Sequence, residues 1–208
     1  MRENFIKLLQ DQPLFNGNNS ATKLNIHIPI RGGLNNFCVD INQRISAVTN
    51  SGIDFSPKSF HVPHITLSMG FVRNEANFEE IMLRVFLFSQ EIKPFEITTG
   101  NPYLKAPQLK YVFIDTDQAE MIIALKQKLE SALGDLLEPL NWDVVNEPPH
   151  ISLAYVKKDI LLVKALLNNY QQSFTFSADA VELSYCGPLG TCVGTIRTFE
   201  FFRPNSLR

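Results

Sequence analysis

The sequence has few cysteines and histidines for its 208 residues. It contains four histidines and three cysteines, Cys38, Cys186 and Cys192. The cysteine count is small and odd, which argues against a disulfide framework, and no Cys-x-x-Cys or mixed Cys/His cluster indicates zinc. We therefore expect free thiols in a reducing compartment, and we expect neither a metal nor another cofactor.

Charge of one sign and long apolar runs are also missing. The formal net charge is −2, so the strongly basic surface of a protein that binds duplex DNA or RNA regardless of sequence is absent. A local cleft can still be positive, which leaves a short oligonucleotide or a nucleotide end as a partner. No run reaches the roughly 18 apolar residues of a membrane span, and the segment Met1–Phe5 lacks the apolar core of a signal peptide. We expect a cytoplasmic monomer without membrane contact.

Two short segments stand out because they match each other at an offset of 86 residues. They read His-Ile-Thr-Leu at 64–67 and His-Ile-Ser-Leu at 150–153, and a proline precedes each histidine. Side chains alternate between the faces of a strand, so His64 shares a face with Thr66, and His150 with Ser152. The same alternation predicts Ser68 on the face of His64. It predicts Met69 and Tyr155 on the opposite, apolar faces.

The paired histidines and hydroxyls suit the cleavage of a phosphodiester. Such a reaction needs a base for the nucleophile and an acid for the leaving oxygen, and two imidazoles can supply both near neutral pH. Hydroxyl groups can donate to the non-bridging phosphate oxygens, where charge develops. A metal is not needed for this chemistry. The alternative is that both histidines are ordinary strand residues, and the duplication in matching apolar contexts argues against it.

Paired H-x-[ST]-hydrophobic strands make the chain resemble the 2H phosphoesterase superfamily. That superfamily includes LigT-like 2′-5′ RNA ligases, 2′,3′-cyclic phosphodiesterases, U6 snRNA-trimming phosphodiesterases, and viral enzymes that cut 2′-5′ oligoadenylates or cyclic oligonucleotides. The resemblance extends from about Lys23 to Phe202 through motif spacing and element order. It implies that His64 and His150 act as acid and base, in an order left open, and that Thr66 and Ser152 hold the phosphate.

The segments around the motifs repeat with the same offset. Alternating apolar residues predict a strand over Lys23–Ile30, and Leu109–Thr116 lies 86 residues later. Helical spacing predicts helices from Asn35 or Asn36 to about Thr49 and over 74–90, 118–137 and 158–170. Further strands are expected over 60–72, 94–104, 173–186 and 192–202, and a short helix over 2–10. The order is β-α-β-α-β twice, followed by one strand.

This order predicts an α+β fold in one bilobal domain over residues 1–208. Residues 1–22 form an N-terminal extension, and the two repeats cover about 23–105 and 109–202. The repeats would pack as lobes related by a pseudo-two-fold axis, with facing sheets, outer helices and the histidine strands side by side on the floor of a cleft. The resemblance implies the same LigT-like fold.

Three further residues are candidates for substrate binding. His27 and Asn25 point away from the apolar face of their strand, and the 86-residue offset relates them to Phe113 and Tyr111. If the apolar faces pack on helices, His27, Tyr111 and Phe113 line the cleft and can stack on a base. The alternative, that they only fill space between the lobes, remains open.

The sequence thus predicts a metal-independent phosphodiesterase acting on RNA-type phosphodiesters, either 2′,3′-cyclic phosphate ends or 2′-5′ linkages. One alternative is an enzyme that degrades oligonucleotide second messengers, such as 2′-5′ oligoadenylate or cyclic oligonucleotides. Another is a nucleotide- or RNA-binding module without turnover. The intact Thr66 and Ser152 argue against that last alternative, because a degenerate copy is expected to lose one of the four motif residues.

Overall fold

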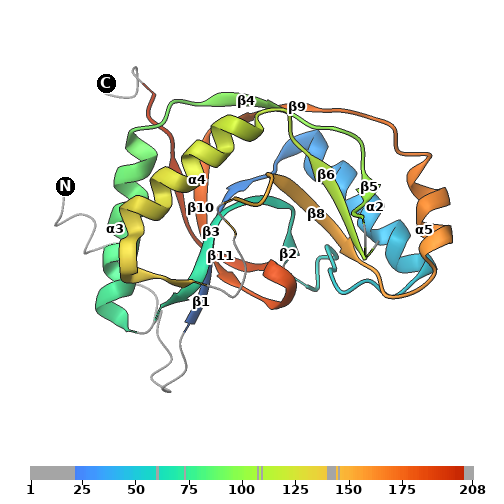
Figure 1. The fold of residues 1–208 in the computed structure, drawn as a ribbon, viewed down its shortest axis with the longest axis horizontal. Coiled ribbons are helices and arrows are strands. Elements are labelled where there is room, and N and C mark those ends of the chain that lie inside the picture. The colour runs from blue at the N-terminus through green and yellow to red at the C-terminus, as the bar shows by residue number, and fades with distance from the viewer. Residues whose placement is uncertain are drawn as a thin grey trace.

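The computed structural model of the chain describes residues 22–59, 61–72, 74–106, 108, 110–139, 144 and 146–203. The helix predicted over 2–10 lies outside the described residues. Within them the predicted α+β architecture is confirmed, as a large antiparallel sheet with helices packed on it (Figure 1).

The sheet has nine strands, in the order β2-β11-β10-β1-β3-β8-β6-β5, with β7 paired to β3, and β4 pairs with β9 in a separate sheet of two strands. The strands are β1 Thr22–Pro29, β2 His61–Val62, β3 His64–Val72, β4 Phe95–Thr98, β5 Tyr103–Leu104, β6 Tyr111–Asp115, β7 Glu138–Pro139, β8 His150–Tyr155, β9 Thr175–Ala178, β10 Ala180–Cys186 and β11 Cys192–Glu200.

Most differences from the predicted strands occur where a residue cannot continue the ladder. The strand predicted over 60–72 is divided at Pro63 into β2 and β3, since proline has no N–H to donate. The strand predicted over 94–104 is divided between β4 and β5 around Asn101 and Pro102. Residues 173–186 likewise form two strands, β9 and β10, which meet at Asp179.

The four α-helices of the described residues are α2 Gly32–Val48, α3 Glu75–Gln90, α4 Ala119–Leu133 and α5 Ile160–Leu167. Asn74 caps α3 by accepting a hydrogen bond from the Asn77 N–H at 2.8 Å. The prediction that Asn35 or Asn36 caps α2 is wrong. The helix begins at Gly32, whose φ of +62° suits glycine, directly after the extended Arg31.

The two sequence repeats are interlocked. The last strands cross over, since β5 follows the first motif in the chain but pairs with β6, while β10 pairs with β1. The helices are exchanged between the repeats as well. Helix α4 of the second repeat packs on β3 of the first, beside α3, and α2 of the first repeat packs on β8 of the second, beside α5. Figure 1 shows α3 and α4 at one end of the molecule and α2 and α5 at the other. Each lobe is therefore built from both repeats.

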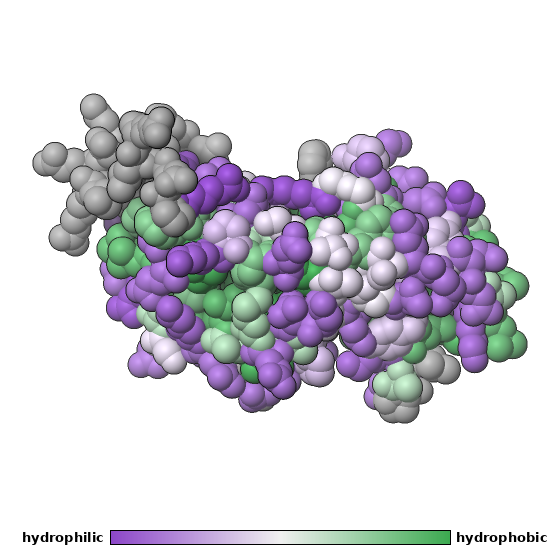
Figure 2. Space-filling model, turned by 90° about the horizontal axis from the view of Figure 1, so that it is seen from above, coloured by the Kyte–Doolittle hydropathy of each residue, from purple (hydrophilic) through white to green (hydrophobic). Residues whose placement is uncertain are grey.

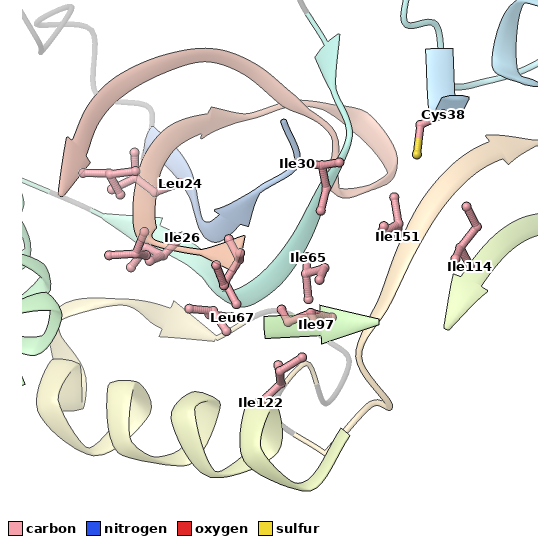
Figure 3. Packing of buried hydrophobic residues seen from close by; sticks show 14 of the residues in the cluster. Leu24, Ile26, Ile30, Cys38, Ile65, Leu67, Ile97, Ile114, Ile122 and Ile151 are labelled. Atoms are coloured by element: carbon pink, nitrogen blue, oxygen red, sulfur yellow. The ribbon is translucent and has the colours of Figure 1, made fainter. Parts of the chain in front are cut away.

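The two histidine strands lie side by side, as predicted, and join the lobes. They pair antiparallel at Ile65 and Ile151, which are both fully buried. Figure 3 shows these two side chains in one apolar cluster, together with Leu67 and with Ile122 of α4. Burying an apolar side chain of this size stabilises the fold by about 1.5–3 kcal/mol. The apolar backs of both motifs thus anchor the two histidines relative to each other.

A β-bulge occurs at the same place in both repeats. The pairing of β1 with β3 shifts between Ile26 and His27, and that of β6 with β8 shifts between Val112 and Phe113, 86 residues later. An extra residue, Leu67 or Leu153, therefore lies in the histidine strand. Bulges re-aim the side chains that follow them and are frequent next to active sites.

The bulge makes part of the predicted alternation wrong. After Leu67, Ser68 turns to the helix side, where its Oγ donates to Glu130 Oε2 of α4 at 3.3 Å. Met69 turns to the side of His64 instead. In the second repeat Tyr155 faces the same way as Ser152 and packs on Tyr111, with ring centroids 4.8 Å apart. The sequence pattern alone does not reveal the extra residue.

Hydrophilic residues cover most of the face shown in Figure 2, with hydrophobic residues exposed between them. Within the described part of the chain, no helix combines the length and the apolar character that a membrane crossing requires. Cys38, Cys186 and Cys192 are free thiols, as predicted, although Cys186 and Cys192 lie opposite each other on β10 and β11.

Candidate active site

One cavity of about 610 Å³ collects the four motif side chains. His64 and Thr66 reach it from β3, and His150 and Ser152 reach it from β8. The alternate residues Ile65, Leu67, Ile151 and Leu153 are fully buried on the other face. The structure therefore brings together, in one site, the residues that the motifs select.

Both imidazoles are held by the same backbone contact. His64 Nδ1 lies 2.8 Å from the Val62 carbonyl oxygen, and His150 Nδ1 lies 2.8 Å from the Pro148 carbonyl oxygen. A carbonyl only accepts, so Nδ1 donates in each ring, and in the neutral tautomer Nε2 carries the lone pair. The proline after each carbonyl holds the chain extended there. Nε2 is then the atom that can take or give a proton in the cavity.

The surroundings lower the pKa of both histidines. Burial is the main cause at His64, where the pKa falls from 6.5 to about 3; charge on His27 lowers it further and outweighs the hydrogen bond to Val62. At His150 burial again lowers the pKa, whereas the Pro148 carbonyl and the Glu147 carboxylate oppose the change. Desolvation disfavours the charged imidazolium, and a bound phosphate anion would favour it.

Phe113 lies against His150 and does not offer an open face to a base. The two rings stack with centroids 3.8 Å apart and an interplanar angle of 20°, and Phe113 is only 5% exposed. The Nζ of Lys105 lies 5.2 Å from the centre of the same phenyl ring. Phe113 lines the cavity as predicted, but its contact orients the imidazole.

Tyr111 lines the cavity too and is half-buried. Its ring packs at 4.8 Å from Tyr155 and at 5.4 Å from Phe113, measured between centroids. An aromatic ring that is supported on one side and still reaches a cavity is suited to stack on a base.

The prediction that His27 lines the cleft is wrong. His27 is fully buried and stands behind His64, with ring centroids 4.8 Å apart and an interplanar angle of 54°. Asn25, which was paired with it in the sequence, is buried as well and bridges to the site: its Nδ2 donates to the Gly190 carbonyl at 3.1 Å and lies 3.4 Å from His64 Nε2. The turn that ends in Gly190 contacts both Asn25 and His64.

Sequence reasoning did not single out several residues of the cavity wall. They are Met69, Gln108, Lys126, Val144, Glu147, Leu189 and Gly190. Lys126 had a detectable signal, because it occupies the apolar face of α4 together with Ile122, Leu129 and Leu133. It is 3% exposed, and its Nζ donates to the carbonyls of Val144 and Glu147 at 2.9 and 2.8 Å. It thereby holds the segment that leads into His150.

The two sides of the cavity differ in charge. Lys105, Lys126 and Glu147 all act on His150 electrostatically. On the side of His64 the wall includes Met69 and Gly190, which carry no charge. Among the described residues, no group of three or more His, Cys, Asp or Glu side chains is placed to hold a metal ion.

Solved structures with the same fold include TT0787 of Thermus thermophilus and LigT of E. coli. The TT0787 structure matches with a TM-score of 0.60 at 15% identity, over 86% of this chain and 97% of that chain. LigT in apo form matches with a TM-score of 0.54 at 13% identity, over 88% and 99%. LigT complexed with 3′-AMP matches with a TM-score of 0.54 at 14% identity, again over 88% and 99%. At sequence identities this low, the similarity shows a shared fold and no more.

No curated protein matches the chain. The model of the 2′-5′ RNA ligase superfamily, in contrast, matches residues 41–185, which is more than half of the sequence and includes both histidine motifs. With this match, the shared fold and the paired motifs in one cavity, the chain belongs to the 2′-5′ RNA ligase superfamily of 2H phosphoesterases.

Proposed function

We propose that this protein is a metal-independent phosphodiesterase that hydrolyses RNA-type phosphodiesters, at 2′,3′-cyclic phosphate ends or 2′-5′ linkages. The observation that carries the proposal is the pair of imidazoles in one cavity, each with Nδ1 bound to a backbone carbonyl. One Nε2 takes a proton from the attacking water or hydroxyl, and the other gives a proton to the leaving oxygen. This is general acid–base catalysis with two groups fixed before the substrate arrives.

Thr66 and Ser152 supply the second part of the mechanism. They line the same cavity two residues after each histidine, on the same strand face. Their hydroxyls donate to the non-bridging phosphate oxygens and stabilise the charge that develops there. The four side chains together provide acid, base and oxyanion donors, so no metal is needed for the step.

A nucleotide fits the cavity in size and character. A volume of about 610 Å³ lies in the ordinary range for small-ligand sites. E. coli LigT has been solved complexed with 3′-AMP and with ATP, which supports a nucleotide ligand here as well. Tyr111 stacks on the base, and Lys105 and Lys126 attract further phosphate charge on the His150 side.

The test is a substrate panel with and without EDTA. The panel contains 2′,3′-cyclic nucleotides, 2′-5′ and 3′-5′ oligonucleotides, and cyclic dinucleotides and trinucleotides, with products separated by chromatography. We expect turnover of cyclic phosphates or 2′-5′ linkages that EDTA does not change. Loss of turnover on chelation, restored by a divalent metal, would contradict the mechanism. Turnover of cyclic oligonucleotides alone would favour a second-messenger enzyme, and tight binding without turnover a binding module.

A further inference from the structure

A ring packs behind each motif histidine, at the same position of each repeat. His27 lies behind His64, with ring centroids 4.8 Å apart, and Phe113 lies behind His150 at 3.8 Å. The two positions are 86 residues apart, and each is the strand partner of the motif hydroxyl residue, Thr66 or Ser152. The repeats therefore share the packing and differ in whether the ring can carry charge.

His27 is surrounded by groups that hold its ring in place. Its Nδ1 lies 3.3 Å from Cys192 Sγ, and its Nε2 lies 3.6 Å from Glu182 Oε2, beyond hydrogen-bond distance. Arg31 Nη2 donates to the other carboxylate oxygen of Glu182 at 3.1 Å. Two threonine hydroxyls also donate to Glu182, at 3.1 Å from Thr198 and 3.2 Å from Thr195. A buried imidazole thus faces a carboxylate that the surrounding strands fix.

The second repeat has no equivalent of this carboxylate among the described residues. The strand next to β1 places Glu182 opposite His27, whereas the strand next to β6 places Tyr103 opposite Phe113. The hydroxyl of Tyr103 donates to Asp115 at 2.8 Å. Only His64 is therefore backed by an imidazole next to an anion.

We propose that His27 is a positioning residue that, together with Glu182, keeps His64 neutral and so makes it the base of the reaction proposed above, with His150 as the acid. The assignment of acid and base rests on the proposed function. The contact between His27 and His64 does not depend on it.

Electrostatics support this division of roles. The pKa of Glu182 is lowered to about 2: burial raises it, but the contacts with His27 and Arg31 lower it more, so the carboxylate beside His27 is ionised. A positive charge on His27 disfavours a second one on His64, which also faces His150 across the cavity. The Gly190 and Val62 carbonyls favour protonated His64, and burial together with His27 outweighs them.

His150 has a different set of neighbours. Beyond burial, its largest electrostatic partner is the Glu147 carboxylate, which favours the protonated ring, while Lys126 and Lys105 oppose it. When the base has the lower pKa and the acid the higher one, the largest fraction of molecules is correctly protonated between the two values. The proposal accordingly assigns the lower pKa to His64 as base and the higher one to His150 as acid.

Cys192, His27 and Glu182 do not form a second catalytic site. The order of a thiol, an imidazole and a carboxylate is that of a nucleophilic triad. Cys192 and His27 are both fully buried, however, and burial raises the pKa of the thiol. A substrate cannot reach the sulfur, which leaves His64 as the group through which His27 can act.

The experiment is an NMR titration of the imidazoles in the full-length chain, which needs no substrate. The variants are His27→Phe, which installs the ring of the second repeat, and Glu182→Gln, which removes the anion behind His27. Both are expected to raise the pKa of His64 by about 1–2 units, as loss of a nearby like charge does, and to leave His150 unchanged. Cys192→Ala is the matched control, because it removes the neutral neighbour of His27 and is expected to change neither titration.

The same variants are then assayed for the pH dependence of kcat/KM. The acid limb is expected to move upward together with the His64 titration, and the alkaline limb to stay in place. An unchanged His64 titration in Glu182→Gln and in folded His27→Phe would overturn the proposal. An alkaline limb that moves with His64 would overturn the role of base. If no panel substrate is turned over, the proposed function fails, while the titration still decides whether His27 acts on His64.

Discussion

The two halves of the candidate active site have the same backbone arrangement and differ in their side chains. Both histidines donate to a carbonyl two residues earlier, and both strands carry a bulge one residue after the motif hydroxyl. Around this frame, one half has His27, Asn25 and Met69 where the other has Phe113, Tyr111 and Tyr155. The duplicated part is therefore the part that the proposed acid–base chemistry requires.

The part that differs sets charge and substrate contact. The wall near His150 is charged and aromatic, with Lys105, Lys126, Glu147 and Tyr111, whereas the wall near His64 includes the uncharged Met69 and Gly190. An oligonucleotide that places its reacting phosphate between the histidines would direct its remaining charge toward His150. Two equal imidazoles can in this way be given unequal tasks by the residues around them.

Removing either histidine is expected to have the largest effect and to show whether both halves are needed. His64→Ala and His150→Ala should each reduce kcat by about 10²–10⁴, as loss of a general acid or base does. The double variant should be little worse, because residues that act as a unit lose most of their effect at the first deletion. Steady-state kinetics on the best panel substrate measures this.

The control for the histidine variants is His61→Gln. His61 is half-buried on β2 and does not line the cavity. This variant should keep nearly full activity. A folded His150→Ala protein with near-wild-type turnover would refute the equivalence of the two halves.

The motif hydroxyls should matter less than the histidines, and by similar amounts on the two sides. Thr66→Ala and Ser152→Ala should each lower kcat by about 10–10³, as removal of an oxyanion donor does. Thr66→Ser and Ser152→Thr keep the hydroxyl and should retain most of the activity. Equal losses in the alanine and the hydroxyl-retaining variants would show that shape, and not the donor, is what counts.

The smallest effects should separate the two aromatic residues of the His150 side. Tyr111→Ala should raise KM about tenfold with little change in kcat, because stacking on a base is worth about 1–3 kcal/mol. Phe113→Ala should lower kcat as well, because Phe113 stacks on His150 at 3.8 Å. Unchanged KM in folded Tyr111→Ala would exclude the stacking role, and identical kinetic patterns in the two variants would remove the distinction drawn between them.

The frame of the site could be predicted from the sequence, because its signals are local. The alternation of apolar residues and the 86-residue offset between His64 and His150 were sufficient to predict two adjacent strands in one fold. Residues 65, 67, 151 and 153 are apolar and must be buried. In both motifs the histidine and the hydroxyl residue therefore point to the opposite face of the strand.

The parts that were missed depend on pairing between distant segments. A bulge is a mismatch between two strands, and nothing in the run from Leu67 to Met69 marks it. The burial of His27 depends on β10 and β11 crossing over to the first repeat, which places Glu182 and Cys192 beside it. Lys126 was visible as a lysine on an apolar helix face, but the carbonyls that it binds lie about twenty residues away.

The most direct test of two histidines acting in one step is the pH profile of kcat/KM for the wild-type protein. Burial lowers the pKa of both His64 and His150 in the free enzyme, and kcat/KM reports the free enzyme. Below both values the base is protonated, and above both values the acid is deprotonated, so activity falls on each side. We expect a bell-shaped profile with its maximum below pH 6.5, the ordinary histidine pKa. A profile with a single limb, or one that is flat from about pH 4 to about pH 8, would contradict the account.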